Sequence, residues 1–313
     1  MTGSDAFDEL SFLPEQAAGL GLAAPPPVER LTLTLGDGRV LGALRYGDEP
    51  PVVTFLHGAG LNAHTWDTTI LALGLPSLAI DLAGHGDSSW RDDADYSART
   101  LAADVVRALD EWTDAPQVLV GQSLGGLTGA AVAAARPGLV RELVIVDITP
   151  GVDPNAGPGQ LRDFFAGPTD WASRDELVDR ALAFGLGGTR EAAERGVYLN
   201  SRVRPDGRVE WKHHFAHLAA AMAAHTAGAA PDAAAADALA TALRATGWDD
   251  LDAVSAPVTL VRGDHGYVTD ADAAEFARRV PAARIEVVHS GHNVQEEQPV
   301  LLAGIVRGRL ESV

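Results

Sequence analysis

Short apolar runs separated by polar turns recur along the chain, and their periodicity predicts the secondary structure. Residues 31–35 alternate between leucine and threonine, a Gly-Asp-Gly turn follows, and residues 40–46 form a second, largely apolar run. Alternation with a period of two on one side of a glycine-rich turn is typical of a β-hairpin. We therefore expect the fold to open with two antiparallel strands.

The runs that follow are continuously apolar, which is typical of strands buried on both faces of a parallel sheet. Segments of helical composition separate them. This order predicts an α/β fold with a mostly parallel sheet and helices on both faces. The further expected strands are residues 52–56, 77–80, 118–120, 143–146, 258–261 and 284–288, and the expected helices lie near residues 65–73, 98–112, 124–135, 271–279 and 294–310.

The pattern changes in residues 149–252, where alanine-rich helical segments carry scattered aromatic side chains and no buried-strand run occurs. We interpret this segment as a helical lid over the carboxyl edge of the sheet, and its tract 233–245 as ordinary helix. Residues 30–148 and 253–313 then form the core. Residues 1–29 are expected to be an N-terminal extension packed on that core.

Composition narrows the possible partners. The 313 residues are 46% hydrophobic and 21% charged, which is typical of a globular protein, and the net charge is −19. Such a charge repels nucleic-acid phosphates and anionic lipids, so neither is an expected partner. The absence of cysteine excludes disulfides, thiolate metal sites and a cysteine nucleophile. No uncharged run approaches the ~20 residues that cross a bilayer, and the acidic N-terminus lacks a signal-peptide pattern, so we expect a cytoplasmic location.

A glycine-flanked serine joins one apolar run to a helix. Residues 118–120 fit a buried strand, and Gly121-Gln-Ser-Leu-Gly125 turns the chain sharply into the helix that follows. This is the G-x-S-x-G pattern of a nucleophile elbow, in which the two glycines remove β-carbons that would collide with the strand and the helix. Ser123 is therefore a candidate nucleophile. The alternative is a plain strand-to-helix turn without chemistry.

In an open parallel sheet the reactive groups lie at the carboxyl ends of the strands. A serine needs a histidine to take its proton, and the histidine needs an orienting carboxylate. The polar groups that directly follow the apolar runs are His57 to Gly60, Asp81 with His85, Ser123, Asp147, Gly263 to Gly266, and His289 to His292.

The order of these motifs resembles the α/β-hydrolase superfamily. The resemblance rests on His57-Gly, on Asp81-x-x-Gly-His-Gly-x-Ser88, on the elbow around Ser123 and on Gly291-His292 before a final helix, and it covers residues 30–310. It implies the superfamily's eight-stranded, mostly parallel sheet with a lid. The segment is most similar to esterase-type members that need no cofactor.

The resemblance also implies roles for the histidines. His292 begins a sequence, Gly-His-Asn-Val-Gln-Glu-Glu-Gln-Pro, that is similar to the family's base loop, so it is the expected base. His289 should lie on the preceding strand as a packed core histidine. His57 and His85 are expected to organise the loops around the site, and His57 is also a candidate for contact with the substrate.

The oxyanion hole and the acid complete the expected site. The backbone N–H groups of Ala59 and Leu124 occupy the positions that the family uses for the oxyanion hole. Many relatives carry the acid after the seventh strand as G-x-x-D, but here Gly266 stands at that position. We favour Asp147, which follows the sixth strand, as the acid, and Asp264 stays open as the alternative.

The lid contributes candidate substrate contacts, of which we favour Trp211. Its other aromatic side chains could cover an apolar substrate or simply pack the lid. These are Phe164, Phe165, Trp171 and Phe215. His213, His214 and His217 have spacings that a metal site could use, but no carboxylate-rich pocket is evident beside them and we expect no metal.

The expected activity is hydrolysis of a small ester, thioester or related carbonyl compound by a serine hydrolase. The serine at position 123 argues against the dehalogenase and epoxide-hydrolase branches, which resemble this chain but need an aspartate there. Carbon–carbon bond hydrolases and cofactor-free peroxidases of the same fold share the expected triad. A non-catalytic homologue that binds a ligand under the lid is the alternative from another class.

Overall fold

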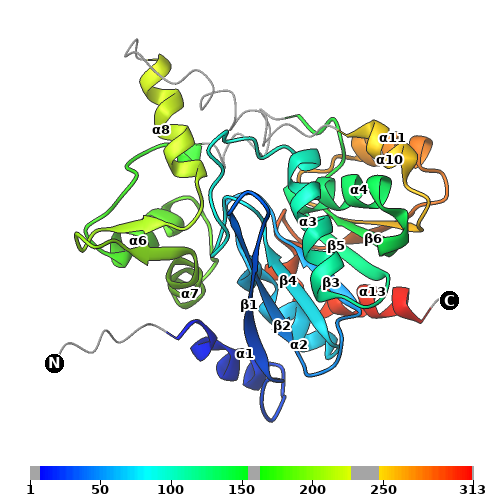
Figure 1. The fold of residues 1–313 in the computed structure, drawn as a ribbon, viewed down its shortest axis with the longest axis horizontal. Coiled ribbons are helices and arrows are strands. Elements are labelled where there is room, and N and C mark those ends of the chain that lie inside the picture. The colour runs from blue at the N-terminus through cyan, green and yellow to red at the C-terminus, as the bar shows by residue number, and fades with distance from the viewer. Residues whose placement is uncertain (1–7, 154–162, 227–246, 312–313) are drawn as a thin grey trace.

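A central sheet organises the computed structural model, which describes residues 8–153, 163–226 and 247–311 (Figure 1). Its strands are β1 (Val28–Thr34), β2 (Val40–Tyr46), β3 (Val53–Leu56), β4 (Ser77–Asp81), β5 (Gln117–Gln122), β6 (Val140–Val146), β9 (Val258–Gly263) and β10 (Arg284–Val288). The strand order is β1-β2-β4-β3-β5-β6-β9-β10, with β2 antiparallel to both of its neighbours and the other pairs parallel. The predicted eight-stranded, mostly parallel sheet is confirmed.

Alternate residues of the central strands enter two separate cores, one on each face of the sheet. Leu119 belongs to one core, whereas Val118 and Val120 belong to the other. Helices α3 (Ala98–Trp112), α4 (Leu124–Ala135) and α11 (Asp270–Arg279) cover the first face, and α1 (Leu13–Gly19), α2 (Asp67–Leu73) and α13 (Pro299–Leu310) cover the second. Short 3-10 helices η1 (Glu9–Phe12), η2 (Ala63–Trp66) and η3 (Pro137–Leu139) complete the core.

The N-terminal segment packs on this core. Leu13 and Ala17 of α1 are buried in the second core, and α1 contacts α2. The side-chain amide of Gln16 donates a hydrogen bond of 3.0 Å to the hydroxyl of Thr68. The described part of the extension thus closes one end of the sheet's second face.

The last helix is broken. Helix α12 (Val294–Glu297) ends at Gln298, whose backbone at φ −133° and ψ 48° is not helical, and α13 then begins at Pro299. A proline disfavours helical backbone at the residue before it, which explains the break within the single helix predicted for residues 294–310. The break sets α12 apart as a short element directly after His292.

The lid lies to one side of the sheet (Figure 1) and contains α6 (Arg174–Ala183), α7 (Arg190–Asn200) and α8 (Phe215–Thr226). A two-stranded sheet of β7 (Ser201–Val203) and β8 (Val209–Trp211) joins α7 to α8, so the expectation of a lid without strands was wrong. Helix α10 (Trp248–Ala253) begins within the segment 149–252 that was expected to be the lid, but it packs against α4 of the core. The alanine-rich tract 233–245 lies outside the described residues.

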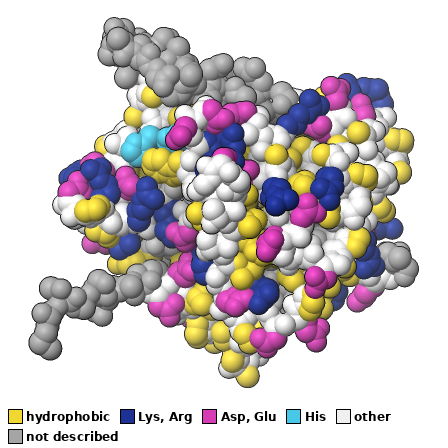
Figure 2. Space-filling view, in the orientation of Figure 1, with side chains coloured by type: hydrophobic (Ala, Val, Ile, Leu, Met, Phe, Trp, Pro, Cys, Tyr) yellow, Lys and Arg dark blue, Asp and Glu magenta, His cyan; other side chains and the backbone are white. Residues whose placement is uncertain are grey.

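Acidic and basic side chains are interspersed over the face that Figure 2 shows. None of the helices within the described ranges is long and apolar enough to cross a membrane.

Candidate active site

Ser123 stands on a strained turn between β5 and α4. Its φ of 52° and ψ of −120° lie in a region that residues with side chains rarely adopt. A β-carbon on Gly121 would lie 2.2 Å from the carbonyl oxygen of Gly125, and one on Gly125 would lie 2.2 Å from that of Leu56. Both positions therefore require glycine, as the elbow pattern predicts. The N–H of Ser123 donates to the carbonyl of Val146 at 3.0 Å and fixes the turn to β6.

Ser123 and His292 line the same cavity, which has a volume of about 720 Å³ and lies between the core and the lid. The lid supplies its apolar wall, which includes Phe164, Phe165, Phe184, Leu186, Val197 and Trp211. Trp211 thus lines the cavity that contains Ser123. Trp171 and Phe215 are buried away from the cavity: Trp171 packs on Trp211 within the lid, and Phe215 packs on core rings such as that of His85.

The expected histidine base is engaged by the expected acid. Nδ1 of His292 lies 2.8 Å from Oδ2 of Asp147, whose side chain is fully buried. The N–H groups of Gly263 and Tyr267 donate to the two carboxylate oxygens at 3.0 and 2.6 Å. Three donors thus hold this carboxylate in one orientation. Asp147 also has a positive φ of 49°, which makes it, like Ser123, a strained residue at the end of a strand.

Gly266 stands where many relatives carry the acid of the G-x-x-D pattern, and its surroundings explain why this chain has no side chain there. A β-carbon at position 266 would lie 2.2 Å from both carboxylate oxygens of Asp147. No side chain fits there while Asp147 points at His292. The glycine that breaks the G-x-x-D pattern is therefore the partner that the acid of β6 requires.

Asp264, the alternative acid, is paired with two other histidines. Its carboxylate lies 2.6 Å from Nδ1 of His265 and 2.8 Å from Nδ1 of His289, and these hydrogen bonds, that to His289 first, lower its pKa to about 2. The prediction of a buried core position for His289 was wrong, because its side chain is 83% exposed. It follows the end of β10, and β10 is an edge strand with only one neighbour.

His57 supports the loop before the oxyanion position and does not reach the cavity. It is fully buried, its Nδ1 donates to the carbonyl of Gly58 at 2.8 Å, and its Nε2 accepts from the N–H of Leu82 at 3.0 Å. Burial lowers its pKa to about 4, so the ring is neutral at pH 7. The candidate role of His57 in substrate contact is therefore corrected to a structural one. His85 is likewise buried, with Nδ1 3.1 Å from the carbonyl of Ala83.

The two expected oxyanion donors flank Ser123. Ala59 belongs to the loop after β3 and lines the cavity. Leu124 directly follows Ser123 as the first residue of α4, and its side chain is buried in the core, so only its backbone can serve the site. The N-terminus of a helix favours negative charge, which suits an oxyanion at this point.

The lid is tied to the oxyanion loop. The side-chain amide of Asn200, at the end of α7, donates to the carbonyl of Gly60 at 2.6 Å, and that of Asn62 donates to the carbonyl of Leu199 at 3.0 Å. The ring of Phe165 packs so closely on Gly60 that a β-carbon there would lie 2.3 Å from it. The lid and the loop therefore fix each other's position.

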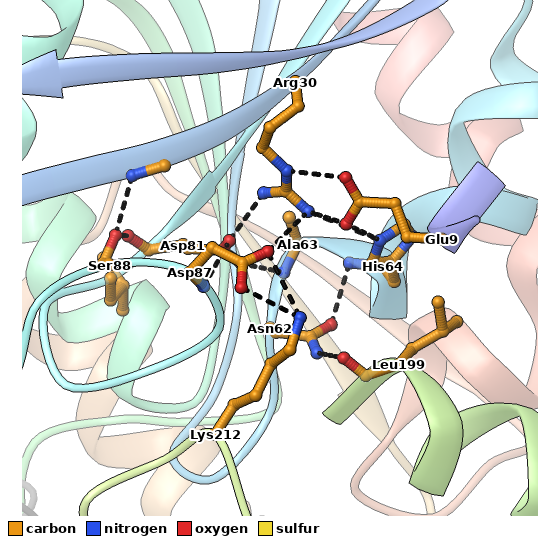
Figure 3. Close-up of polar contacts among 12 residues, drawn as sticks. Glu9, Arg30, Asn62, Ala63, His64, Asp81, Asp87, Ser88, Leu199 and Lys212 are labelled. Atoms are coloured by element: carbon orange, nitrogen blue, oxygen red, sulfur yellow. Dashed lines mark hydrogen bonds and ion pairs between the residues drawn. The ribbon is translucent and has the colours of Figure 1, made fainter. Parts of the chain in front are cut away.

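A half-buried ionic cluster holds the other side of that loop (Figure 3). Arg30 donates to Asp81 at 2.7 Å and also pairs with Glu9 of η1. The second oxygen of Asp81 accepts the N–H of Ala63 at 2.7 Å, and His64 lies 3.1 Å from Glu9. Asp81 therefore anchors the start of η2, and the N-terminal segment supports the oxyanion loop through Arg30.

The sequence patterns did not predict two contacts that His292 and its loop make in the structure. The ring of Tyr267 stacks on the imidazole, with ring centroids 3.6 Å apart and planes inclined by 10°. The side-chain amide of Gln122 lies 3.3 Å from the carbonyl of His292 and 3.3 Å from Oδ1 of Asn293. Both contacts restrict the imidazole and its loop. An isolated aromatic residue in a turn gives no periodic signal by which it could have been found.

The lid histidines pack against aromatic rings. His213 is buried with its ring stacked on Trp211, and burial lowers its pKa well below the ordinary value. His214 stacks on Trp90 with ring centroids 4.4 Å apart. The rings of His213 and His214 therefore each pack on a tryptophan side chain.

Comparison with known proteins agrees with this geometry. The sequence model of the alpha/beta hydrolase fold matches residues 51–299. The chain belongs to the α/β hydrolase fold family. It is 39% identical to esterase Rv0045c of Mycobacterium tuberculosis over 98% of this chain and 97% of that protein. The family membership that the motifs indicated is thereby confirmed.

A solved structure and a second relative also cover most of this α/β hydrolase. A solved structure of the M. tuberculosis esterase Rv0045c, from work on its inhibition by transition metals, has a TM-score of 0.80 at 37% identity and covers 98% of this chain and 100% of that one. The sn-1-specific diacylglycerol lipase ABHD11 of Mus musculus is 28% identical over 80% of this chain and 77% of that protein.

Proposed function

We propose that this α/β hydrolase is a serine esterase that cleaves a small ester through an acyl-enzyme. The observation that carries the proposal is that Ser123 and His292 line one cavity while Asp147 holds Nδ1 of the imidazole. The similarity to an esterase over nearly the whole chain supports the same activity.

The proposed mechanism begins with attack of the Ser123 hydroxyl on the ester carbonyl carbon. Nε2 of His292 takes the hydroxyl proton, and Asp147 stabilises the imidazolium through Nδ1–H. The N–H groups of Ala59 and Leu124 hold the oxyanion, and each such donor contributes about 3 kcal/mol to the stability of the transition state. The imidazolium then protonates the leaving alcohol. Water, deprotonated by His292, releases the acid from the acyl-enzyme.

The proposed substrate has an apolar acyl or alcohol part. Aromatic side chains of the lid, including Phe164, Phe165 and Trp211, form one wall of the cavity, and its volume of about 720 Å³ accommodates a ligand of moderate size. Charged residues, including Arg195, also line the cavity and can bind a polar end of the substrate.

Two measurements test the proposal. A fluorophosphonate should label folded wild-type protein at Ser123, and Ser123→Ala should abolish both the labelling and the hydrolysis of p-nitrophenyl esters. A series of acyl chain lengths, run beside the matching thioesters, gives the preferred substrate class.

Other outcomes would favour the alternatives. A folded wild-type protein that forms no adduct on Ser123 would contradict the hydrolase proposal and favour a ligand-binding homologue. Labelling at Ser123 without hydrolysis of any ester or thioester would instead favour a carbon–carbon bond hydrolase or a cofactor-free peroxidase. These can be distinguished by assays for cleavage of a diketone and for halide oxidation with peroxide.

A further inference from the structure

Two opposite charges line the cavity that contains Ser123, and neither has an ion-pair partner in the part of the chain that the structure describes. Arg195 belongs to α7 of the lid, and Glu296 belongs to α12, four residues after His292. The two are near enough for the charge of Arg195 to act on the Glu296 carboxylate, although they form no ion pair with each other. Both groups are therefore available to a ligand.

A chain of hydrogen bonds fixes the orientation of Glu296. The side-chain amide of Gln295 donates to the hydroxyl of Thr65 at 3.2 Å, and that hydroxyl donates to Oε1 of Glu296 at 2.8 Å. Among the residues that the structure describes, Oε2 accepts only a long hydrogen bond of 3.4 Å, from the side-chain amide of Asn293. Oε2 is thus held in place with the capacity to accept from a further donor.

Two glutamines at this end of the cavity have unused acceptors. Gln295 is fully buried, and Gln16 of α1 donates to Thr68 at 3.0 Å. Within the described ranges, the side-chain oxygen of each glutamine is buried without a hydrogen-bond donor. Both residues line the cavity, as do Thr65 and Thr68. A buried acceptor without a donor is unfavourable, so this end of the cavity suits a ligand that donates hydrogen bonds.

The other charged side chains of the cavity wall already have partners. His64 lies 3.0 Å from the carboxylate of Asp67, and His265 lies 2.6 Å from that of Asp264. Glu297 accepts a backbone N–H at 2.8 Å. The arginine of α7 and the glutamate of α12 therefore determine which groups this end of the cavity can bind.

The combination of these two charges favours a neutral ligand. A carboxylate would be repelled by Glu296, and an ammonium group would be repelled by Arg195. Hydroxyl groups are uncharged, and each can both donate and accept a hydrogen bond. A group with several hydroxyls can therefore donate to the carboxylate of Glu296 and accept from the guanidinium of Arg195 at the same time.

The position of Glu296 places these hydroxyls on the alcohol part of the ester. In the proposed mechanism the leaving oxygen takes a proton from Nε2 of His292, so the alcohol part lies on the His292 side of the cavity. Asn293, which contacts Glu296, directly follows His292 in the chain. The apolar wall that the lid provides is then left for the acyl part.

We propose that the substrate is a monoester of a polyol, with two of the free hydroxyls bound by Glu296 and Arg195, an assignment that rests on the proposed function. The acyl group passes to Ser123, and the polyol leaves as a neutral alcohol with the proton from His292. Water then releases the acid from the acyl-enzyme. Glu296 and Arg195 thereby set the specificity for the leaving alcohol.

Hydrolysis of two matched esters, followed by titration of the released acid at constant pH, tests this assignment. Glycerol monobutyrate and propyl butyrate share the acyl group and a three-carbon alcohol, but only the former carries free hydroxyls. We expect the wild-type kcat/KM to be higher for glycerol monobutyrate by at least about tenfold, because hydrogen bonds to charged groups are strong. The ratio of the two kcat/KM values should fall by at least about fivefold in Glu296→Ala and in Arg195→Ala, since each removes one of these bonds.

Comparing this ratio between proteins cancels the difference in intrinsic reactivity of the two esters. Glu194→Ala is the matched control. Glu194 precedes Arg195 on α7, but its side chain is 44% exposed and does not line the cavity. The ratio in this variant should equal that of the wild type.

Three results would overturn the assignment. An equal ratio in the wild type, Glu296→Ala and Arg195→Ala would overturn it and leave the esterase activity intact. Faster hydrolysis of butyrylcholine, or of the butyrate ester of lactate, than of glycerol monobutyrate would show that a single charge selects the substrate. Folded wild-type protein that hydrolyses none of these esters would contradict the proposed function together with this assignment.

Discussion

Replacing Asp147 by asparagine separates the contribution of the carboxylate from that of its position. The carboxylate accepts three hydrogen bonds, with Oδ1 facing the N–H of Gly263 and Oδ2 facing both the N–H of Tyr267 and Nδ1 of His292. An amide offers only one oxygen. Whichever way it turns, its NH₂ group meets at least one of these donors.

Both orientations impair the proposed reaction. If the NH₂ group faces His292, Nδ1 must accept, the proton moves to Nε2, and the ring can no longer take the proton of Ser123. If the amide is flipped, its NH₂ group opposes the N–H of Gly263, and the charge that stabilises the imidazolium is still missing. We expect kcat/KM to fall by about 10⁴, as in other Ser-His-Asp enzymes, which corresponds to about 5 kcal/mol of transition-state stabilisation.

The assay is hydrolysis of a p-nitrophenyl ester by Asp147→Asn, with thermal unfolding as the check on folding. A buried donor without an acceptor costs about 1–3 kcal/mol, so the variant should unfold at a lower temperature but remain folded at 25 °C. Asp264→Asn is the control and should keep turnover close to that of the wild type. Near-normal turnover in Asp147→Asn, combined with inactive Asp264→Asn, would refute the assignment of the acid.

Two further predictions follow from the packing and the charges. Gly266→Ala should lower turnover, and it should lower the free energy of unfolding by about 1–3 kcal/mol, because its β-carbon would lie 2.2 Å from the carboxylate of Asp147. Gly304→Ala is the control: a β-carbon there has no atom within 4 Å, so this variant should be neutral or stabilising. Burial lowers the pKa of His64, but Asp67 and other neighbours outweigh this and raise it from 6.5 to about 9. A raised pKa stabilises the fold below pH 6.5, and this contribution, about 3 kcal/mol at most, should disappear as the pH rises through 9. The melting temperature of His64→Gln, followed from pH 6 to 10, should therefore fall less steeply than that of the wild type, and equal slopes would contradict the assignment.

The sheet could be predicted because each of its strands carries a local signal. The six inner runs are apolar on both faces, and the elbow around Ser123 is fixed by short-range backbone collisions. Elements without such a signal were missed. Strands β7 and β8 are three residues long each, too short for a period of two to be recognised.

Contacts between distant segments account for the rest of the site that was not predicted. The cluster of Glu9, Arg30 and Asp81 joins the N-terminus, the first strand and the fourth, and nothing in the local sequence distinguishes these charges from solvent-exposed ones. The prediction that His289 is buried was wrong for a related reason. Its apolar neighbours suggested burial, but burial of a strand depends on its place in the sheet, and β10 has a partner on only one side.

The position of the acid shows how two apparent irregularities explain each other. Gly266 looks like a loss of function when the loop after β9 is compared with the family's G-x-x-D pattern, and Asp147 looks like a residue that merely ends β6. In the folded chain the carboxylate of Asp147 fills the space that a side chain at position 266 would need. The N–H of Tyr267, the next residue, then donates to that carboxylate at 2.6 Å. Gly266 and Asp147 therefore constitute one feature of this chain, because the glycine leaves the space that the carboxylate occupies.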